Sequence, residues 1–153
     1  MISLALGDGF RHGVHPPDLK DLTSGLPIRR MPFPERIHLP LRQHAGAPAR
    51  ALVRRGDRVE RGDRVGEAQG WVSSPVHASA AGTVRDVGLR RHADGGMAET
   101  VVIDVDPVSA QLPRPRIVPE WKALSPEETV AAIRDAGVVG LGGAAFPTHV
   151  KLS

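Results

Sequence analysis

The feature that most restricts the fold of this chain is a repeat. The sequence Arg-Gly-Asp-Arg-Val occurs at residues 55–59 and again at residues 61–65. Glycine adopts positive φ at low cost, and an aspartate side chain can accept a hydrogen bond from the backbone of its own turn. Each Gly-Asp pair therefore predicts a turn, after which Val59 and Val65 are expected to point into one core. Two closely spaced turns favour short strands around them.

The central region carries further strand patterns. Residues 100–105 alternate, so Val101, Ile103 and Val105 are expected to share one face, with Asp104 on the other. Turn-forming residues separate the patterns, which favours a compact sandwich or barrel and a mainly β fold class. The remaining strands are predicted at residues 37–41, 51–53, 65–68, 76–78 and 82–87.

Proline separates this β region from both ends of the chain. Proline fixes φ and removes a backbone donor, so proline-rich stretches favour extended chain over helix. We predict an extended N-terminal strap over residues 1–36 and a proline-rich linker over residues 107–124. The β module is then expected at residues 37–106, and a separate C-terminal segment at residues 125–153.

The C-terminal segment opens with a helix signal. Ser125, Pro126 and Glu128 fit the first positions of a helix with a capping box, and Gly137 fits its C-terminal cap. An apolar stripe between them predicts a helix from about residue 126 to about residue 136. This signal concerns structure and carries no chemistry.

Residues 51–87 resemble the small β-sandwich domains that carry lipoyl or biotin on a lysine. The three lysines of this chain, Lys20, Lys122 and Lys151, all lie outside that stretch. A swinging-arm carrier needs an amine at an exposed hairpin tip to form its amide. The module is therefore expected to be unmodified and to hold, dock or shape a partner.

The composition excludes several kinds of site. The chain has no cysteine, so disulfides, zinc–thiolate sites and iron–sulfur clusters cannot form within it. No apolar run approaches the roughly 20 residues of a membrane span. The net charge is +3, and acidic residues are interleaved with arginines at residues 54–61, so a nucleic-acid-binding face is not expected.

The seven histidines are dispersed. His12 and His15 could share a metal only on a helix, which Pro16 and Pro17 disfavour. No serine-nucleophile motif accompanies them. We predict neither a metal site nor a catalytic residue in this chain.

A glycine-rich segment follows the predicted helix, and two interpretations of it are open. Gly140, Gly142 and Ala145 fit a loose dinucleotide-binding pattern, in which backbone N–H groups cradle a phosphate. The Gly-Lys-Ser/Thr of a Walker loop is missing. The second interpretation is a flexible loop after a capped helix, with no ligand.

Several ordered segments resemble the N-terminal part of the C subunit of the Rnf-type (Rsx-type) ion-translocating electron-transport complex. The resemblance implies a lipoyl-like barrel-sandwich hybrid domain. An NADH- and flavin-binding domain similar to the flavin-carrying subunit of respiratory complex I is expected to follow. The resemblance also implies a peripheral position on the cytoplasmic side of the bacterial inner membrane, with other subunits of the complex as partners. The segments are residues 13–20, 39–48, 59–67, 74–78, 82–84 and 137–153.

The same resemblance assigns a role to the glycine-rich segment, as the loop against the flavin phosphate. It implies FMN, NADH and 4Fe-4S clusters in the full-length family, whereas we expect no cofactor bound by this chain alone. The residues that correspond to the loop are Gly140, Gly142, Gly143, Ala144, Phe146, Thr148 and Lys151.

Two departures from the family bear on this role. The family loop usually has glycine where Ala145 stands, and the chain stops at Ser153, soon after the loop. The chain is therefore expected to be a truncated or split form, inactive alone. Its residues after Gly137 are expected to be poorly ordered, for want of a partner domain to bury them. The alternative is a stand-alone, non-catalytic docking or scaffold module with a lipoyl-like fold.

Overall fold

The structure is a computed structural model that describes residue 17, residues 19–113 and residues 120–153. His12, His15 and the centre of the predicted linker lie outside these residues. The chain divides into two units, Met1–Pro32 and Phe33–Ser153. The described residues of the first unit form a turn, in which the Thr23 and Ser24 N–H groups donate to the Lys20 carbonyl. They contain no strand or helix.

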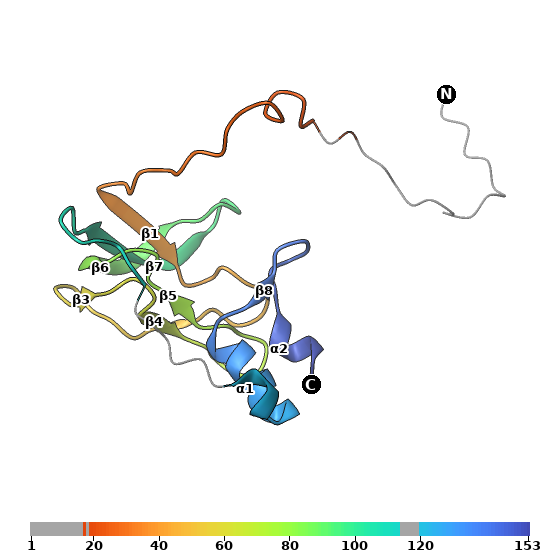
Figure 1. Cartoon of the computed structure of the whole chain (residues 1–153). Coiled ribbons are helices and arrows are strands. Elements are labelled where there is room, and N and C mark those ends of the chain that lie inside the picture. The colour runs from red at the N-terminus through yellow and green to blue at the C-terminus, as the bar shows by residue number, and fades with distance from the viewer. Residues whose placement is uncertain (1–16, 18, 114–119) are drawn as a thin grey trace, which may run out of the picture. The chain divides into compact units, whose positions relative to one another are not determined.

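The described residues of the second unit form two larger antiparallel sheets and a third sheet of two strands, so the predicted mainly β architecture is confirmed (Figure 1). One of the larger sheets has the strand order β1-β7-β6-β3 and the other the order β2-β4-β5. The first sheet is formed by β1 (Arg36–Pro40), β3 (Arg58–Val59), β6 (Gly82–Arg91) and β7 (Met97–Val105). The second is formed by β2 (Arg50–Ala51), β4 (Arg64–Glu67) and β5 (Val76–His77).

The core draws on strands of both sheets and on the turns between them. Val59 and Val65, which follow the two Gly-Asp turns, are 4% and 0% exposed, so the prediction that both enter one core is confirmed. Burial of such aliphatic side chains is the main source of stability in a unit of this kind. The other core residues are Leu39, Leu41, Ala49, Val76, Ala78, Val84, Val101 and Ile103.

The repeat forms two equivalent turns. Gly56 and Gly62 both have φ of +94°. The Asp57 carboxylate accepts from the Arg54 N–H, and the Asp63 carboxylate accepts from the Glu60 N–H. The predicted turn chemistry is thus confirmed in both copies.

Each turn is also connected to a later segment of the chain by the same pair of hydrogen bonds. The Gly56 N–H donates to the Val84 carbonyl, and the Val84 N–H donates to the Asp57 carbonyl, both at 2.8 Å. The second turn repeats this pair with Ala78 in place of Val84, again at 2.8 Å. The six-residue period of the sequence therefore becomes a repeated connection between the turns and residues 78–84.

Strand β7 follows the predicted alternation only in part. Val101 and Ile103 are fully buried and Asp104 lies on the other face, as predicted, but Val105 is only partly buried. Val102 is 2% exposed although it shares the face of Asp104. Long polar side chains from the neighbouring strands, among them Arg36, Arg85 and Arg90, line a cleft around it, which a period-two pattern does not reveal.

The start of the predicted linker is fixed to the sandwich by Gln111. Its side-chain amide accepts from the Ala81 N–H at 2.7 Å and donates to the Ala81 carbonyl at 3.1 Å. The Gln111 carbonyl accepts from the Arg61 guanidinium at 3.0 Å. Backbone groups that would otherwise be buried without a partner are satisfied in this way.

The C-terminal segment contains the predicted helix, here α1 (Pro126–Asp135), after a short 3-10 helix, η1 (Trp121–Ala123). The predicted capping box is present, since Ser125 accepts from the Glu128 N–H and Glu128 accepts from the Ser125 N–H. Gly137 follows with φ of +71°, as a cap requires. The chain then forms β8 (Val139–Gly140), β9 (Phe146–Pro147) and α2 (Thr148–Lys151).

Candidate functional site

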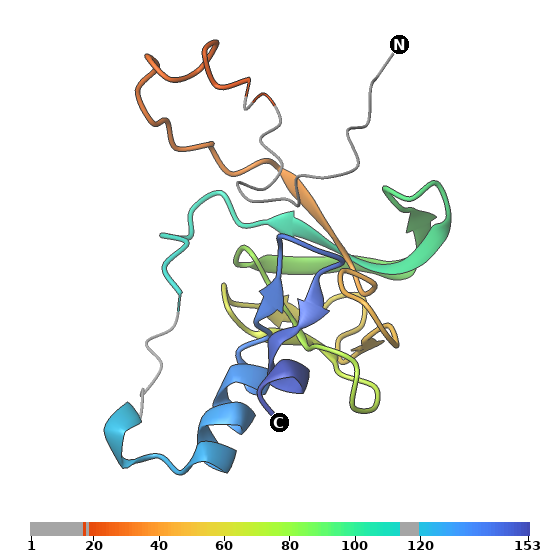
Figure 2. The ribbon, with the colours of Figure 1, turned by 90° about the vertical axis from the view of Figure 1, so that its right-hand side faces the viewer.

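The residues predicted to form the phosphate loop all lie in one hairpin–helix unit. Strands β8 and β9 pair antiparallel, and α1 and α2 lie at the base of this hairpin (Figure 2). Gly140 ends β8, Phe146 opens β9, and Thr148 and Lys151 lie in α2. The turn between the strands is exposed and contains Gly142, Gly143 and Ala144.

Two glycines of this turn are not required by the fold of the described residues. A methyl group added to Gly142 or Gly143 would meet no atom within 4 Å, and neither residue has a left-handed φ. By contrast, a methyl group at Gly82 would lie 2.2 Å from the Asp104 carbonyl oxygen. Open space over consecutive glycines is what a ligand that approaches the backbone closely needs.

Ala145 has φ of +50°, a left-handed conformation that glycine adopts more readily. The family resemblance places glycine at this position. The backbone here has a conformation that suits glycine, and alanine adopts it at a cost in strain. The Ala145 carbonyl accepts from the Ala45 N–H at 3.3 Å, which connects the loop to the segment after β1.

The loop unit is anchored on the hairpin between β4 and β5, at Gly70 and Trp71. His149 of α2 is 1% exposed, and its Nε2–H donates to the Trp71 carbonyl at 2.9 Å. The two rings meet edge to face, with centroids 5.3 Å apart. Arg134 of α1 donates to the Gly70 carbonyl at 3.1 Å, and its guanidinium lies 5.8 Å from the centroid of the Trp71 ring.

This anchoring corrects one expectation. The sequence predicts little burial after Gly137, and Leu141 is indeed 87% exposed. The expectation is wrong for Pro147 and His149, which are both fully buried. The sequence contains no periodic signal for this contact, because Trp71 and His149 lie far apart along the chain. A large aromatic residue next to Gly70 in a turn is the available clue.

His44 contacts the β4–β5 hairpin at Ser74. Its Nδ1–H donates to the Ala45 carbonyl at 3.1 Å, and its Nε2 accepts from the Ser74 N–H at 3.2 Å. Those contacts fix the tautomer and connect the chain after β1 with the β4–β5 hairpin. His44 therefore has a structural role and is not available as a metal ligand in this arrangement.

An open cavity of about 670 Å³ adjoins the loop at Ala144. Its wall includes Arg42, His92 and Asp94, and Arg42 and His92 both contact the Asp94 carboxylate, at 3.4 and 3.1 Å. The Gly96 N–H, and after it the His92 side chain, lowers the pKa of Asp94. The positive charge of Arg42, the one arginine that lines this cavity, is therefore already balanced by the Asp94 carboxylate.

Lys151 lies with its ammonium group 5.7 Å from the centroid of the Phe146 ring, so the predicted lysine is placed at the base of the hairpin.

Within the described parts of the chain, no group of three histidine, cysteine, aspartate or glutamate residues could hold a metal ion. The same residues include no helix long and apolar enough to cross a membrane.

The two facing sheets and their paired turns define a class of protein, the barrel-sandwich hybrid modules. This member has no lysine between Lys20 and Lys122. The family of RnfC barrel sandwich hybrid domains matches residues 8–107. The chain belongs to this family, and the fold and the membership that the sequence predicted are confirmed.

Three bacterial relatives extend the match beyond that domain. The C subunit of the proton-translocating ferredoxin:NAD(+) oxidoreductase complex of Clostridium ljungdahlii is 40% identical over 144 residues, which cover 94% of this chain and 32% of the relative. The C subunit of the Na(+)-translocating complex of Acetobacterium woodii is 41% identical, with the same coverage. The C subunit of the ion-translocating oxidoreductase complex of Rhodobacter capsulatus is 43% identical over 147 residues, 94% of this chain and 28% of the relative. The chain thus spans about a third of the length of these relatives.

Proposed function

We propose that this chain is the N-terminal part of the C subunit of an ion-translocating electron-transport complex. In this proposal, the barrel-sandwich module at residues 37–106 is a rigid base. It holds residues 140–151 in the position where they contact the phosphate of a flavin. The module itself carries out no reaction and bears no swinging arm.

The observation that carries the proposal is the open space over Gly142 and Gly143. Neither the conformation nor the packing of the described residues requires glycine at these positions. A phosphate that approaches the backbone N–H groups of the turn does require it. FMN is the ligand that the family resemblance indicates, and when bound it supplies transfer of electrons from NADH toward one-electron carriers. In this proposal, Thr148 and Lys151 of α2 lie next to the loop.

The anchor at Trp71 gives the module its part in this function. The β4–β5 hairpin holds α1 and α2 through Arg134 and His149, which both contact the Trp71 ring. A cofactor-binding loop needs support of this kind, because positioning errors of about 1 Å are costly. The hairpin tip thus supports the loop rather than carrying a prosthetic group.

The relatives' names describe complexes that couple ferredoxin and NAD(+) to ion translocation. We propose that the partners of this chain are the other subunits of such a complex, at the cytoplasmic face of the bacterial inner membrane. NADH, FMN and 4Fe-4S clusters belong, in this proposal, to the part of the relatives that follows the segment matched by this chain.

A chimeric protein tests the proposal. Residues 1–153 of this chain replace the matching N-terminal segment of the Rhodobacter capsulatus relative, and FMN released on denaturation is counted per chimera. The chimera is expected to contain FMN near one per chain, whereas this chain alone contains none. Replacing Gly142 and Gly143 with valine is expected to lower the FMN content at least about tenfold, with the melting temperature retained.

Gly25 provides the control. A methyl group there also meets no atom within 4 Å, and its φ is not left-handed. The Gly25→Val chimera is expected to keep its FMN. Equal FMN content in the loop variant and the parent chimera would refute the phosphate contact. It would favour the alternative, a docking or scaffold module without a part in cofactor binding.

A further inference from the structure

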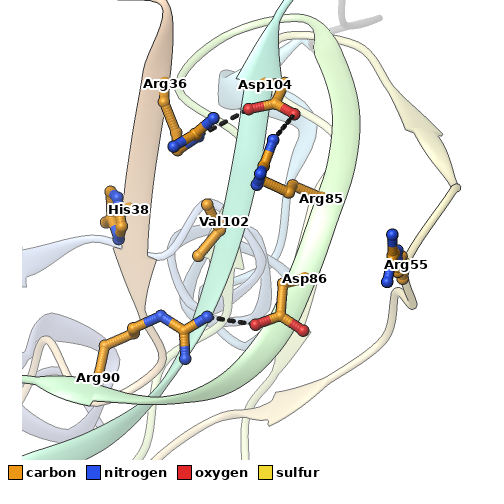
Figure 3. Close-up of a pocket in the computed structure, with 8 residues that line it drawn as sticks. All are labelled: Arg36, His38, Arg55, Arg85, Asp86, Arg90, Val102 and Asp104. Atoms are coloured by element: carbon orange, nitrogen blue, oxygen red, sulfur yellow. Dashed lines mark hydrogen bonds and ion pairs between the residues drawn. The ribbon is translucent and has the colours of Figure 1, made fainter.

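The outer face of the four-stranded sheet contains a second candidate site, which shares no residue with the glycine-rich loop. A cleft of about 580 Å³ opens there over Val102 (Figure 3). Strands β1, β6 and β7 provide seven of its lining residues, and Arg55 comes from the turn before β3. The lining residues are Arg36, His38, Arg55, Arg85, Asp86, Arg90, Val102 and Asp104.

A β-bulge concentrates charge in this cleft. The pairing of β6 with β7 shifts between Val84, which pairs with Ile103, and Asp86, which pairs with Val102. Arg85 is the extra residue, so Arg85 and Asp86 both lie on the outer face although they are adjacent in sequence. Bulges commonly re-aim side chains in this way.

The carboxylates of the cleft are fewer than its guanidinium groups. Arg36 and Arg85 both bind Asp104, at 2.7 and 3.1 Å, one on each carboxylate oxygen. Arg90 binds Asp86, and Arg55 has no ion pair among the described residues. Four guanidinium groups thus face two carboxylates, which leaves an excess of two positive charges from the arginines.

The free N–H groups of these arginines remain available. A guanidinium has five N–H donors, and the contacts to Asp104 and Asp86 use few of them. The side chains of Arg36, Arg85 and Arg90 are 45%, 54% and 41% exposed, so solvent and solutes reach them. In Figure 3 these three side chains surround Val102 from both neighbouring strands.

We propose that this cleft binds a doubly charged phosphate group. The charge excess matches a dianion, and the planar donor edge of arginine matches phosphate oxygens in pairs. The concave shape suits a group that enters the cleft, such as a phosphate monoester or pyrophosphate. The phosphate can be carried by a small molecule or by a lipid head group, and the two sources are distinguished by experiment.

The test uses the 153-residue chain labelled with ¹⁵N and titrated with inorganic pyrophosphate, with amide shifts as the readout. Amides of residues 36, 85, 90 and 102 are expected to shift together and to saturate. The double variant Arg36→Gln/Arg85→Gln is expected to bind at least about tenfold more weakly, because two charge-assisted contacts are lost. In a parallel arm, vesicles with and without phosphatidic acid, whose head group is a phosphate monoester, are sedimented with the chain. Binding to these vesicles without pyrophosphate binding assigns the phosphate to a lipid.

Two further variants keep the test specific. Arg58→Gln removes an arginine that binds Asp106 at 2.9 Å outside the cleft, and it is expected to bind like the parent. Asp86→Asn removes a competing carboxylate and is expected to bind more tightly, a gain that unfolding cannot mimic. Failure of both pyrophosphate and the vesicles to bind would overturn the proposal. An equal loss in Arg58→Gln and in the double variant would also overturn it, since binding would then depend on overall charge.

Discussion

Replacing Ala145 with glycine is expected to stabilise the loop unit. Ala145 has φ of +50°, and a left-handed conformation costs a residue with a Cβ about 1–2 kcal/mol. Glycine removes this cost but gains entropy in the unfolded chain, which offsets about 0.4–1 kcal/mol. The net effect is a stabilisation of roughly 0.5–1 kcal/mol, or about 2–4 °C in melting temperature.

Ala144 supplies a matched control one residue away. It is exposed in the turn and is not among the described residues with positive φ. Ala144→Gly relieves no strain and adds only unfolded-state entropy, so it is expected to destabilise by about 0.4–1 kcal/mol. The two alanine-to-glycine changes should therefore have opposite signs.

Fluorescence of Trp71 measures both changes, because its ring contacts His149 and Arg134. The other tryptophan, Trp121, is 69% exposed and can be replaced with phenylalanine, so that Trp71 alone reports. Urea titration of the three proteins then gives their free energies of unfolding. If Ala145→Gly proves no more stable than its parent, or if Ala144→Gly stabilises equally, the strain assigned to Ala145 is refuted.

Three other predictions concern the buried His149, the ion pairs of Asp104 and the absence of lysine from the sandwich. His149→Ala should destabilise the loop unit by about 2–3 kcal/mol in the Trp71 assay, because a buried hydrogen bond and ring packing are both lost; an unchanged midpoint would contradict the anchor. The Arg36 and Arg85 guanidinium groups hold the pKa of Asp104 below its ordinary value of 3.8. The contribution of the Asp104 carboxylate to folding stability is therefore complete above pH 3.8 and is lost as the pH falls through the lower pKa of the folded state. When the melting temperature is measured against pH, it should fall less steeply in acid for Asp104→Asn than for the parent, and identical slopes would exclude this contribution. Intact mass after expression with active lipoylation and biotinylation should show no adduct, and a stoichiometric adduct within residues 51–105 would contradict the unmodified module.

The sandwich was largely predictable because its signals are local. The Gly-Asp turns specify their own backbone and direct Val59 and Val65 inward, and Ser125 with Glu128 specifies the start of α1. Strands β6 and β7 are longer than predicted, since they pair as far as Arg91 and Met97, close to the tip of their hairpin.

The sites were less predictable because they depend on contacts between distant segments. The family resemblance identifies the glycine-rich loop, but neither pattern nor spacing indicates that Trp71 and His149 meet. The arginine cleft depends on the bulge at Arg85, which places two adjacent residues on one face and breaks the period of two. Nearby prolines place Gln111 in a predicted linker, although its amide pairs with the backbone of Ala81.

Hydrogen exchange of the 153-residue chain tests the central claim most directly, namely that the barrel-sandwich module holds the glycine-rich segment in place. The Thr148 N–H donates to the Val138 carbonyl at 3.0 Å, next to the buried His149. The account predicts measurable protection of Thr148, lost in His149→Ala, while the exposed amide of Gly142 exchanges freely. Val84 and Ala78 of the sandwich should stay protected in both proteins. If Thr148 exchanged at the rate of an unstructured amide while Val84 remained protected, the segment would not be anchored and the account would be wrong.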